Sequence, residues 1–330
     1  MGPDAVDAGP RSDGTESCRR LGCHASTVRE STVGVVMVFG AAVGFGTIGI
    51  FGEVAAAIDL ELARLLPARF LLATLVVVAL AAARGWARPA SRGEWAATLA
   101  LGVVYTAMTL FYFVSLRYLT AGLATVVLYT YPAMVVALSV TFLGEAVTGR
   151  KLLALVLAMA GVGLVVGTDT AGADPIGVGL ALGAAACYAI YTTGSRGISA
   201  TLAPRALMLG VLVGTTASMA VYGVLDGGLG LPVGGEEWGV VIGMVVVSTV
   251  LPLLLFYEGV SRLAASRVGV VSTVEPVVTV TLGAALLGEP VTAFVVAGGA
   301  LVLGAVVLAQ RGEDTAPDRA AAGSVLDRGD

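Results

Sequence analysis

A glutamate and a proline stand side by side within one of the most apolar stretches of the chain. Glu275 is the eighth residue of a run that predicts a membrane-spanning helix, and Pro276 follows it. A carboxylate at such a depth costs about 2.5 to 3.5 kcal/mol on insertion scales, so it normally faces a cavity or a partner. Ser272 and Thr279 share its helical face. The Glu275 carboxylate predicts proton coupling or cation binding. The alternative is that Glu275 forms a hydrogen bond to a neighbouring helix and only stabilises the fold.

Pro276 has a second consequence for the backbone. Proline lacks an N–H group, so the carbonyl four residues earlier, at Ser272, loses its helical partner. Free carbonyls at membrane depth are tolerated where they line a cavity. We therefore predict helix breaks next to a cavity at Pro276 and at Pro132, which occupies the equivalent place in an earlier apolar run.

Tyrosines and hydroxyl residues recur at helical spacing in the apolar runs. A tyrosine offers an apolar ring face and one hydroxyl group, which suits a small amphipathic ligand. The alternative is an aromatic belt at the membrane surface, which fits Tyr257 and also suits Tyr191. The stripes predict a cavity wall formed by Tyr105, Thr109, Tyr112, Tyr131 and Tyr188.

Arg69 lies about five residues into the second apolar run, counted from its outer end. Its long side chain can extend to the membrane surface or pair with Glu53, and it can instead bind a substrate carboxylate in bidentate fashion. The sequence favours the first interpretation and leaves the second open.

The chain contains few groups for metal or covalent chemistry. Cys18, Cys23 and His24 do not match a zinc-ligand spacing, and Cys187 lies within an apolar run as a small packing residue. No predicted span contains Asp or His, which argues against an aspartyl dyad, a histidine triad or a metal centre within the membrane. The sequence predicts no enzyme, no metal and no cofactor.

Composition indicates a membrane protein. Apolar residues make up 57% of the chain and charged residues 13%, and the mean hydropathy is +0.92. Soluble domains carry about 25% charged residues. A bilayer core needs helices of about 20 apolar residues, and the sequence predicts ten: Thr32 to Gly52, Leu65 to Ala83, Trp95 to Leu116, Ala121 to Phe142, Leu152 to Thr168, Ile176 to Ser195, Ala206 to Leu225, Trp238 to Tyr257, Val268 to Leu287 and Val291 to Gln310.

Basic residues predict the orientation of these spans. With both termini in the cytoplasm, 16 of the 19 Lys and Arg residues fall in cytoplasmic segments, as the positive-inside rule requires. We therefore expect a multi-pass protein of the plasma (inner) membrane, surrounded by lipid. No basic patch with interleaved aromatics indicates nucleic-acid binding.

One segment occurs twice. The run from Leu119 to Thr148 realigns without gaps 144 residues later, from Leu263 to Thr292, with 12 of 30 positions identical. The copies fall on the predicted fourth and ninth spans, and this odd offset inverts their direction. The sequence predicts an all-α polytopic membrane protein of ten transmembrane helices in two inverted five-helix repeats, 32–168 and 176–310, joined by a link at 169–175 and flanked by disordered cytoplasmic tails at 1–31 and 311–330.

The duplicated motifs resemble a known family. The pattern from Leu116-Arg117-Tyr118 to Leu143-Gly144-Glu145, and its counterpart from Arg267 through Ser272-Thr273-Val274-Glu275-Pro276 to Leu287-Gly288-Glu289, are similar to those of EamA-type transporters in the drug/metabolite transporter superfamily. The resemblance spans nearly all ten helices. It implies an inverted repeat and transport of small metabolites, often export of amino acids or related compounds. Gly44-Phe45-Gly46-Thr47 departs from the Trp-Gly-Ser sequence expected there.

These observations predict a secondary transporter for a small polar or amphipathic metabolite, working as an exporter by alternating access, with protons as a candidate coupling ion. No nucleotide-binding Gly-x-x-x-x-Gly-Lys loop is found. The alternative is a membrane receptor or assembly factor without cargo. Glycine pairs four residues apart, such as Gly210 and Gly214, favour packing within a monomer over a homodimer face.

Overall fold

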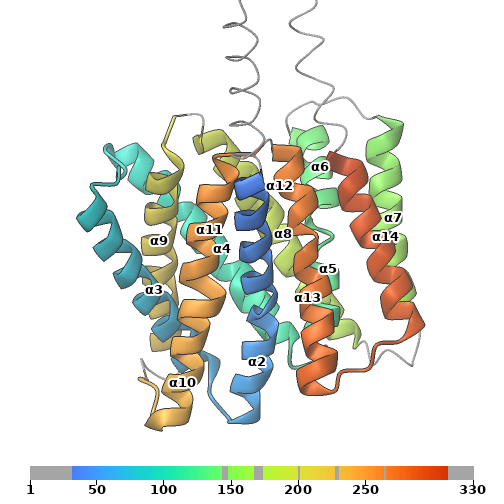
Figure 1. Cartoon of the computed structure of the whole chain (residues 1–330), viewed down its shortest axis with the longest axis horizontal. Coiled ribbons are helices and arrows are strands. Elements are labelled where there is room, and N and C mark those ends of the chain that lie inside the picture. The colour runs from blue at the N-terminus through green and yellow to red at the C-terminus, as the bar shows by residue number, and fades with distance from the viewer. Residues whose placement is uncertain are drawn as a thin grey trace, which may run out of the picture.

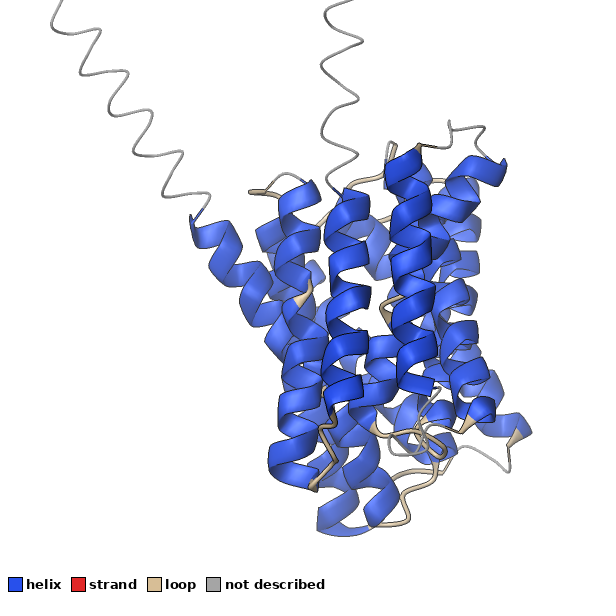
Figure 2. Ribbon diagram, turned by 90° about the vertical axis from the view of Figure 1, so that its right-hand side faces the viewer, coloured by secondary structure: helices blue, strands red, loops and turns tan. Residues whose placement is uncertain are grey.

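The computed structural model describes residues 32–142, 148–166, 174–199, 201–226, 230–263 and 265–310. Across these ranges the secondary structure is helical, with no strand (Figure 2). The first helix spans Thr32–Ala57, and its second part is α2 (Ile48–Ala57). The other helices are α3 (Leu62–Arg84), α4 (Arg92–Ser115), α5 (Ala121–Leu128), α6 (Tyr131–Phe142), α7 (Gly149–Val166), α8 (Pro175–Ser199), α9 (Pro204–Leu225), α10 (Gly234–Val245), the π-helical turn η2 (Val246–Val250), α11 (Leu251–Val260), α12 (Ala265–Ser272), α13 (Val274–Leu282), the π-helical turn η3 (Gly283–Leu287) and α14 (Ala293–Gln310).

Eight helical stretches of the described chain are long and apolar enough to cross a membrane. They coincide with eight of the ten predicted spans, so the protein is a multi-pass membrane protein. At the predicted fifth and tenth positions lie shorter apolar helices, Leu152–Leu164 within α7 and Ala293–Leu308 within α14. These two helices pack against each other at one side of the bundle (Figure 1). The predicted tails at 1–31 and 311–330, and residues 169–173 of the predicted link, lie outside the described residues.

The two copies of the duplicated segment run in opposite directions. In the view of Figure 1, α5 and α6 rise from the lower to the upper end of the bundle, whereas α12 and α13 descend. Helix α13 packs against α5, so the two segments meet inside the bundle. The first helix begins and α14 ends at the same, upper end.

Several helices are interrupted near the middle of the bundle. The first helix turns at Thr47, whose hydroxyl lies 2.6 Å from the carbonyl oxygen of Gly44 and 2.7 Å from the hydroxyl of Ser248 in η2. The duplicated segments break at Tyr129–Thr130 and at Thr273, shortly before Pro132 and Pro276. A proline, Pro252, also follows η2. Its ring nitrogen has no hydrogen to donate, so the ladder of helical hydrogen bonds is interrupted there. Interrupted helices at mid-membrane depth are the usual place for transport sites.

Close helix contacts depend on glycine. A side chain on Gly102 of α4 would begin 2.7 Å from the Cα atom of Gly214 in α9, and one on Gly210 would begin 2.3 Å from the hydroxyl of Thr98. The prediction that Gly210 and Gly214 pack within the monomer is confirmed. Small residues replace hydrophobic attraction between helices, which lipid does not provide.

Glu289 joins the second half of the chain to the start of α5. Its carboxylate accepts hydrogen bonds from the backbone N–H groups of Ala121, at 2.8 Å, and Gly122, at 3.2 Å. Gly283 makes room for this carboxylate, because an added Cβ atom would lie 2.3 Å from a Glu289 oxygen. A negative charge at the N-terminus of a helix satisfies unpaired N–H groups and complements the helix dipole.

Replacing Glu289 by alanine is therefore expected to lower the free energy of unfolding by about 0.5 to 2 kcal/mol, the range for losing a side chain that caps a helix N-terminus. Thermal unfolding in detergent measures the effect. The matched control is Glu236→Ala, because Glu236 lies exposed in the first turn of α10. Equal melting temperatures for the two variants would show that the cap does not support α5.

Candidate functional site

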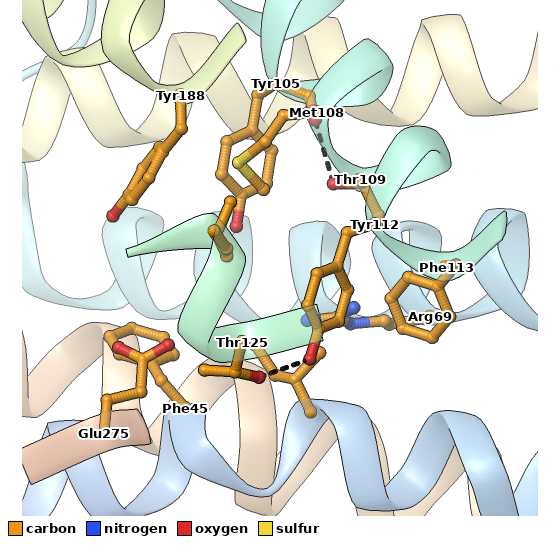
Figure 3. A pocket seen from close by; sticks show the side chains of 12 residues that line it. Phe45, Arg69, Tyr105, Met108, Thr109, Tyr112, Phe113, Thr125, Tyr188 and Glu275 are labelled. Atoms are coloured by element: carbon orange, nitrogen blue, oxygen red, sulfur yellow. Dashed lines mark hydrogen bonds between the residues drawn. The ribbon is translucent and has the colours of Figure 1, made fainter. Parts of the chain in front are cut away.

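A cavity of about 90 Å³ lies among the interrupted helices, with Glu275 and Arg69 on opposite sides of it (Figure 3). The first helix, α4 and α5 contribute most of its wall, and α3, α8 and α13 contribute one residue each. Both halves of the chain therefore surround the cavity. Its lining consists of Phe45, Ile48, Arg69, Tyr105, Met108, Thr109, Tyr112, Phe113, Thr125, Leu128, Tyr188 and Glu275.

Glu275 has one side-chain partner among the described residues. Its Oε2 atom accepts a hydrogen bond from the hydroxyl of Tyr129 at 2.9 Å. The same hydroxyl lies 2.7 Å from the carbonyl oxygen of Ser272, which is the carbonyl that Pro276 deprives of its helical partner. The prediction that this carbonyl is free is wrong, because Tyr129 binds it.

The geometry around Tyr129 couples its hydroxyl to the protonation state of Glu275. A phenol carries one proton, and two acceptor oxygens lie within hydrogen-bonding distance of it. When the carboxyl group is protonated, it can donate to the Tyr129 oxygen while Tyr129 donates to Ser272. When it is ionised, both acceptors compete for the single Tyr129 proton.

Sequence reasoning missed Tyr129. It precedes Pro132 by three residues and belongs to none of the tyrosine stripes, and the repeat alignment places Tyr131, not Tyr129, opposite Glu275. The run Tyr-Thr-Tyr-Pro could have indicated Tyr129. A helix break before the proline gives the two tyrosines different directions, so Tyr129 can contact residues that Tyr131 does not.

Besides Glu275 and Arg69, four of the predicted residues line the cavity. The hydroxyl of Tyr112 lies 2.8 Å from that of Thr125, a residue the sequence did not indicate. Thr109 donates to the Tyr105 carbonyl at 2.8 Å, which satisfies its hydroxyl within α4. Tyr105, Thr109, Tyr112 and Tyr188 thus form one wall.

Three predicted residues lie beside the cavity instead of lining it. The ring centre of Tyr131 is 4.3 Å from that of Tyr188 and 5.9 Å from that of Tyr129, so it supports the wall from behind. Ser272 donates to the Val268 carbonyl. Thr279 donates to the Gly46 carbonyl at 2.9 Å and ties α13 to the break in the first helix.

Arg69 does not extend to the membrane surface. The residue is 2% exposed, and its Nε atom donates to the hydroxyl of Thr249 at 2.9 Å. The guanidinium group lies 4.9 Å from the ring centre of Phe70. Among the described residues, Arg69 forms no ion pair with Glu53. The favoured prediction, that Arg69 extends to the membrane surface or pairs with Glu53, is wrong, because the turn η2 presents Thr249 to Arg69 inside the bundle. Such π-helical turns are frequent at functional sites.

The aromatic-belt interpretation also fails for Tyr191. Its ring stacks on Tyr188 at 6.0 Å and contacts Tyr105 at 5.2 Å, inside the bundle. The described residues hold no group of three or more His, Cys, Asp or Glu side chains that could bind a metal ion. Cys18, Cys23 and His24 lie outside the described residues.

Comparison with known proteins gives a consistent result. A model described as the EamA-like transporter family matches residues 32–167 and 175–310. The threonine/homoserine exporter RhtA of Escherichia coli K12 is 27% identical over 249 residues, which cover 74% of this chain and 79% of the exporter. An uncharacterized transporter of Archaeoglobus fulgidus is 31% identical over 188 residues, which cover 56% of this chain and 66% of that protein.

A solved crystal structure shares the fold. It superposes with a TM-score of 0.61 at 20% sequence identity, covering 84% of this chain and 96% of that chain.

Proposed function

Because this chain belongs to the EamA-like transporter family, we propose that it is a secondary transporter that exports a small polar or amphipathic metabolite across the plasma membrane. An amino acid or a related compound is the proposed cargo, in line with the exporter RhtA among its relatives. The observation that carries the proposal is the cavity: both halves line it, and an acidic and a basic side chain face it from opposite sides.

We propose alternating access between two inverted five-helix repeats, with α7 and α14 as the fifth and tenth membrane helices and both termini in the cytoplasm. The opposite directions of α5–α6 and α12–α13 support this arrangement. So does the position of the cavity where these segments meet, because rocking of one repeat against the other would expose such a site to each side in turn.

Glu275 is the proposed coupling group. It lies on the cavity wall and its proton state determines how Tyr129 distributes its single hydrogen bond between the carboxyl group and the Ser272 carbonyl. The broken helices α12 and α13 meet next to this carbonyl, at Thr273. A proton on Glu275 would therefore act directly on the hinge between them.

Flux measurements in proteoliposomes test the proposal. Vesicles with purified protein are loaded with a mixture of amino acids and related metabolites, a pH gradient is imposed, and released compounds are identified by mass spectrometry. Transport predicts that at least one compound leaves faster than from protein-free vesicles. A receptor or assembly factor without cargo predicts no difference, and that result would reject the transporter function.

Replacing Tyr112 by phenylalanine is expected to weaken cargo binding in the same vesicles by about two- to tenfold, because a buried hydrogen bond contributes about 0.5 to 1.5 kcal/mol. The change removes the hydroxyl that meets Thr125 on the cavity wall. Tyr131→Phe is the matched comparison, since the Tyr131 ring lies behind Tyr188. Competition against the identified cargo gives both affinities. An unchanged affinity for Tyr112→Phe would assign this residue to packing alone.

A further inference from the structure

The two charged residues of the cavity define the chemistry of its ligand. We propose that the cargo is a compact zwitterion whose carboxylate binds Arg69 and whose ammonium group binds Glu275. The inference rests on the proposed function and specifies the substrate class of the same site.

Arg69 offers the anchor for the carboxylate end. Within the described part of the chain, its guanidinium group forms one hydrogen bond, from Nε to Thr249, and no ion pair. The Nε bond fixes the side chain and leaves the two terminal nitrogens to face the cavity that Arg69 lines. A buried cation without an anion is costly, and a planar guanidinium group binds a carboxylate in bidentate fashion. A ligand carboxylate would supply the missing partner.

Glu275 offers the complementary end. Tyr129 occupies its Oε2 atom, and no Arg or Lys of the described residues pairs with its carboxylate. Figure 3 shows Glu275 and Arg69 on opposite sides of the cavity, with Thr125 between them. Glu275 and Arg69 do not form an ion pair with each other. A ligand with an ammonium group facing Glu275 and a carboxylate facing Arg69 would complement both charges.

The size of the cavity limits the ligand. At about 10 to 15 Å³ for each water-sized group, the volume of about 90 Å³ holds roughly six to nine non-hydrogen atoms. The numbers of non-hydrogen atoms in the amino acids from alanine to valine fall within this range. The cavity wall also includes Ile48, Met108 and Leu128, which would contact a short carbon chain.

Binding of a matched ligand panel to the purified protein in nanodiscs tests the inference. The panel contains glycine, alanine, serine, threonine, valine, β-alanine and γ-aminobutyrate, each with the amino alcohol that lacks the carboxylate and the hydroxy acid that lacks the amine. For the tightest-binding amino acid, wild type is expected to discriminate against both analogues by about tenfold or more, as for other charged hydrogen bonds.

The variants assign each end of the ligand. In Arg69→Gln the amino acid and its amino alcohol should bind with equal affinity, because the partner of the carboxylate is gone. In Glu275→Gln the amino acid and its hydroxy acid should bind with equal affinity, because the partner of the ammonium group is gone. Comparing ligands within one variant removes general effects of misfolding. Thr249→Val is a second test that keeps the guanidinium group but removes its positioning bond, and it should reduce the discrimination against the amino alcohol.

Three results would overturn the inference: equal binding of an amino acid and its amino alcohol by wild type, retained discrimination in Arg69→Gln, or no binding of any zwitterion in the panel. If the flux screen then finds a different cargo, the transporter function stands and only the substrate class is wrong. If no compound crosses the membrane in that screen, the proposed function itself fails.

Discussion

Replacing Glu275 by glutamine is expected to reduce gradient-driven flux to the level of protein-free vesicles and to remove its dependence on pH. The amide oxygen of glutamine can still accept the hydrogen bond that Tyr129 donates to Oε2 at 2.9 Å, and the two side chains have nearly the same volume. The fold should therefore persist. An amide cannot bind or release a proton in the physiological range, so the hinge at Thr273 would no longer respond to the proton gradient.

The measurement is efflux of the identified cargo at a series of external pH values, together with the yield and melting temperature of each variant. Glu53→Gln is the matched control, because Glu53 is a half-buried glutamate in the first helix that does not line the cavity. We expect it to transport like wild type. Unchanged flux and pH dependence in Glu275→Gln would leave this residue a purely structural role.

Replacing Gly102 by leucine is expected to destabilise the helix bundle by more than about 3 kcal/mol, the upper end of the usual cost of overpacking. A Cβ atom at this position would lie 2.6 Å from the backbone nitrogen of Thr215 and 2.7 Å from the Cα atom of Gly214. These are backbone atoms of α9, which cannot rotate away as a side chain can, so α4 and α9 must separate. Overpacking costs about 1 to 3 kcal/mol in well-packed cores, and occasionally more. Separation also breaks the contact between the Thr215 hydroxyl and the Gly102 carbonyl.

Size-exclusion chromatography in detergent distinguishes the outcomes. The matched control is Gly179→Leu, since a Cβ atom added at this exposed position of α8 would meet no described atom within 4 Å. The control should give a single symmetric peak, whereas Gly102→Leu should give aggregate or little protein. A symmetric peak and a wild-type melting temperature for Gly102→Leu would show that α4 and α9 do not need this close approach.

The sequence predicted the elements of the fold better than the contacts between them. Eight of the ten predicted spans are long apolar helices in the structure, because hydropathy is a property of each segment by itself. The sequence predicts that the fifth span begins at Leu152, whereas α7 begins at Gly149. The residues before Leu152 are not apolar, so a search for apolar runs leaves them out of the span although they are helical. The family resemblance, which rests on the duplicated motifs, is confirmed.

The candidate site was predicted in part. Glu275, Tyr105, Tyr112, Thr109 and Tyr188 line the cavity, and each was identified from its residue type and helical spacing. Tyr131, Ser272 and Thr279 share those signals but lie beside the cavity. Helical spacing groups residues on one face of a helix, and it does not say whether that face meets a cavity or a neighbouring helix.

The sequence alone determined that this chain crosses a membrane, that it contains a duplicated segment, and that a carboxylate, Glu275, and a guanidinium group, Arg69, fall within its apolar runs. Only the tertiary structure decided what those two groups contact. Tyr129 reaches Glu275 across 146 residues of chain, and Arg69 reaches Thr249 across 180. Such contacts depend on how helices cross and where they break, and local hydropathy carries no information about either.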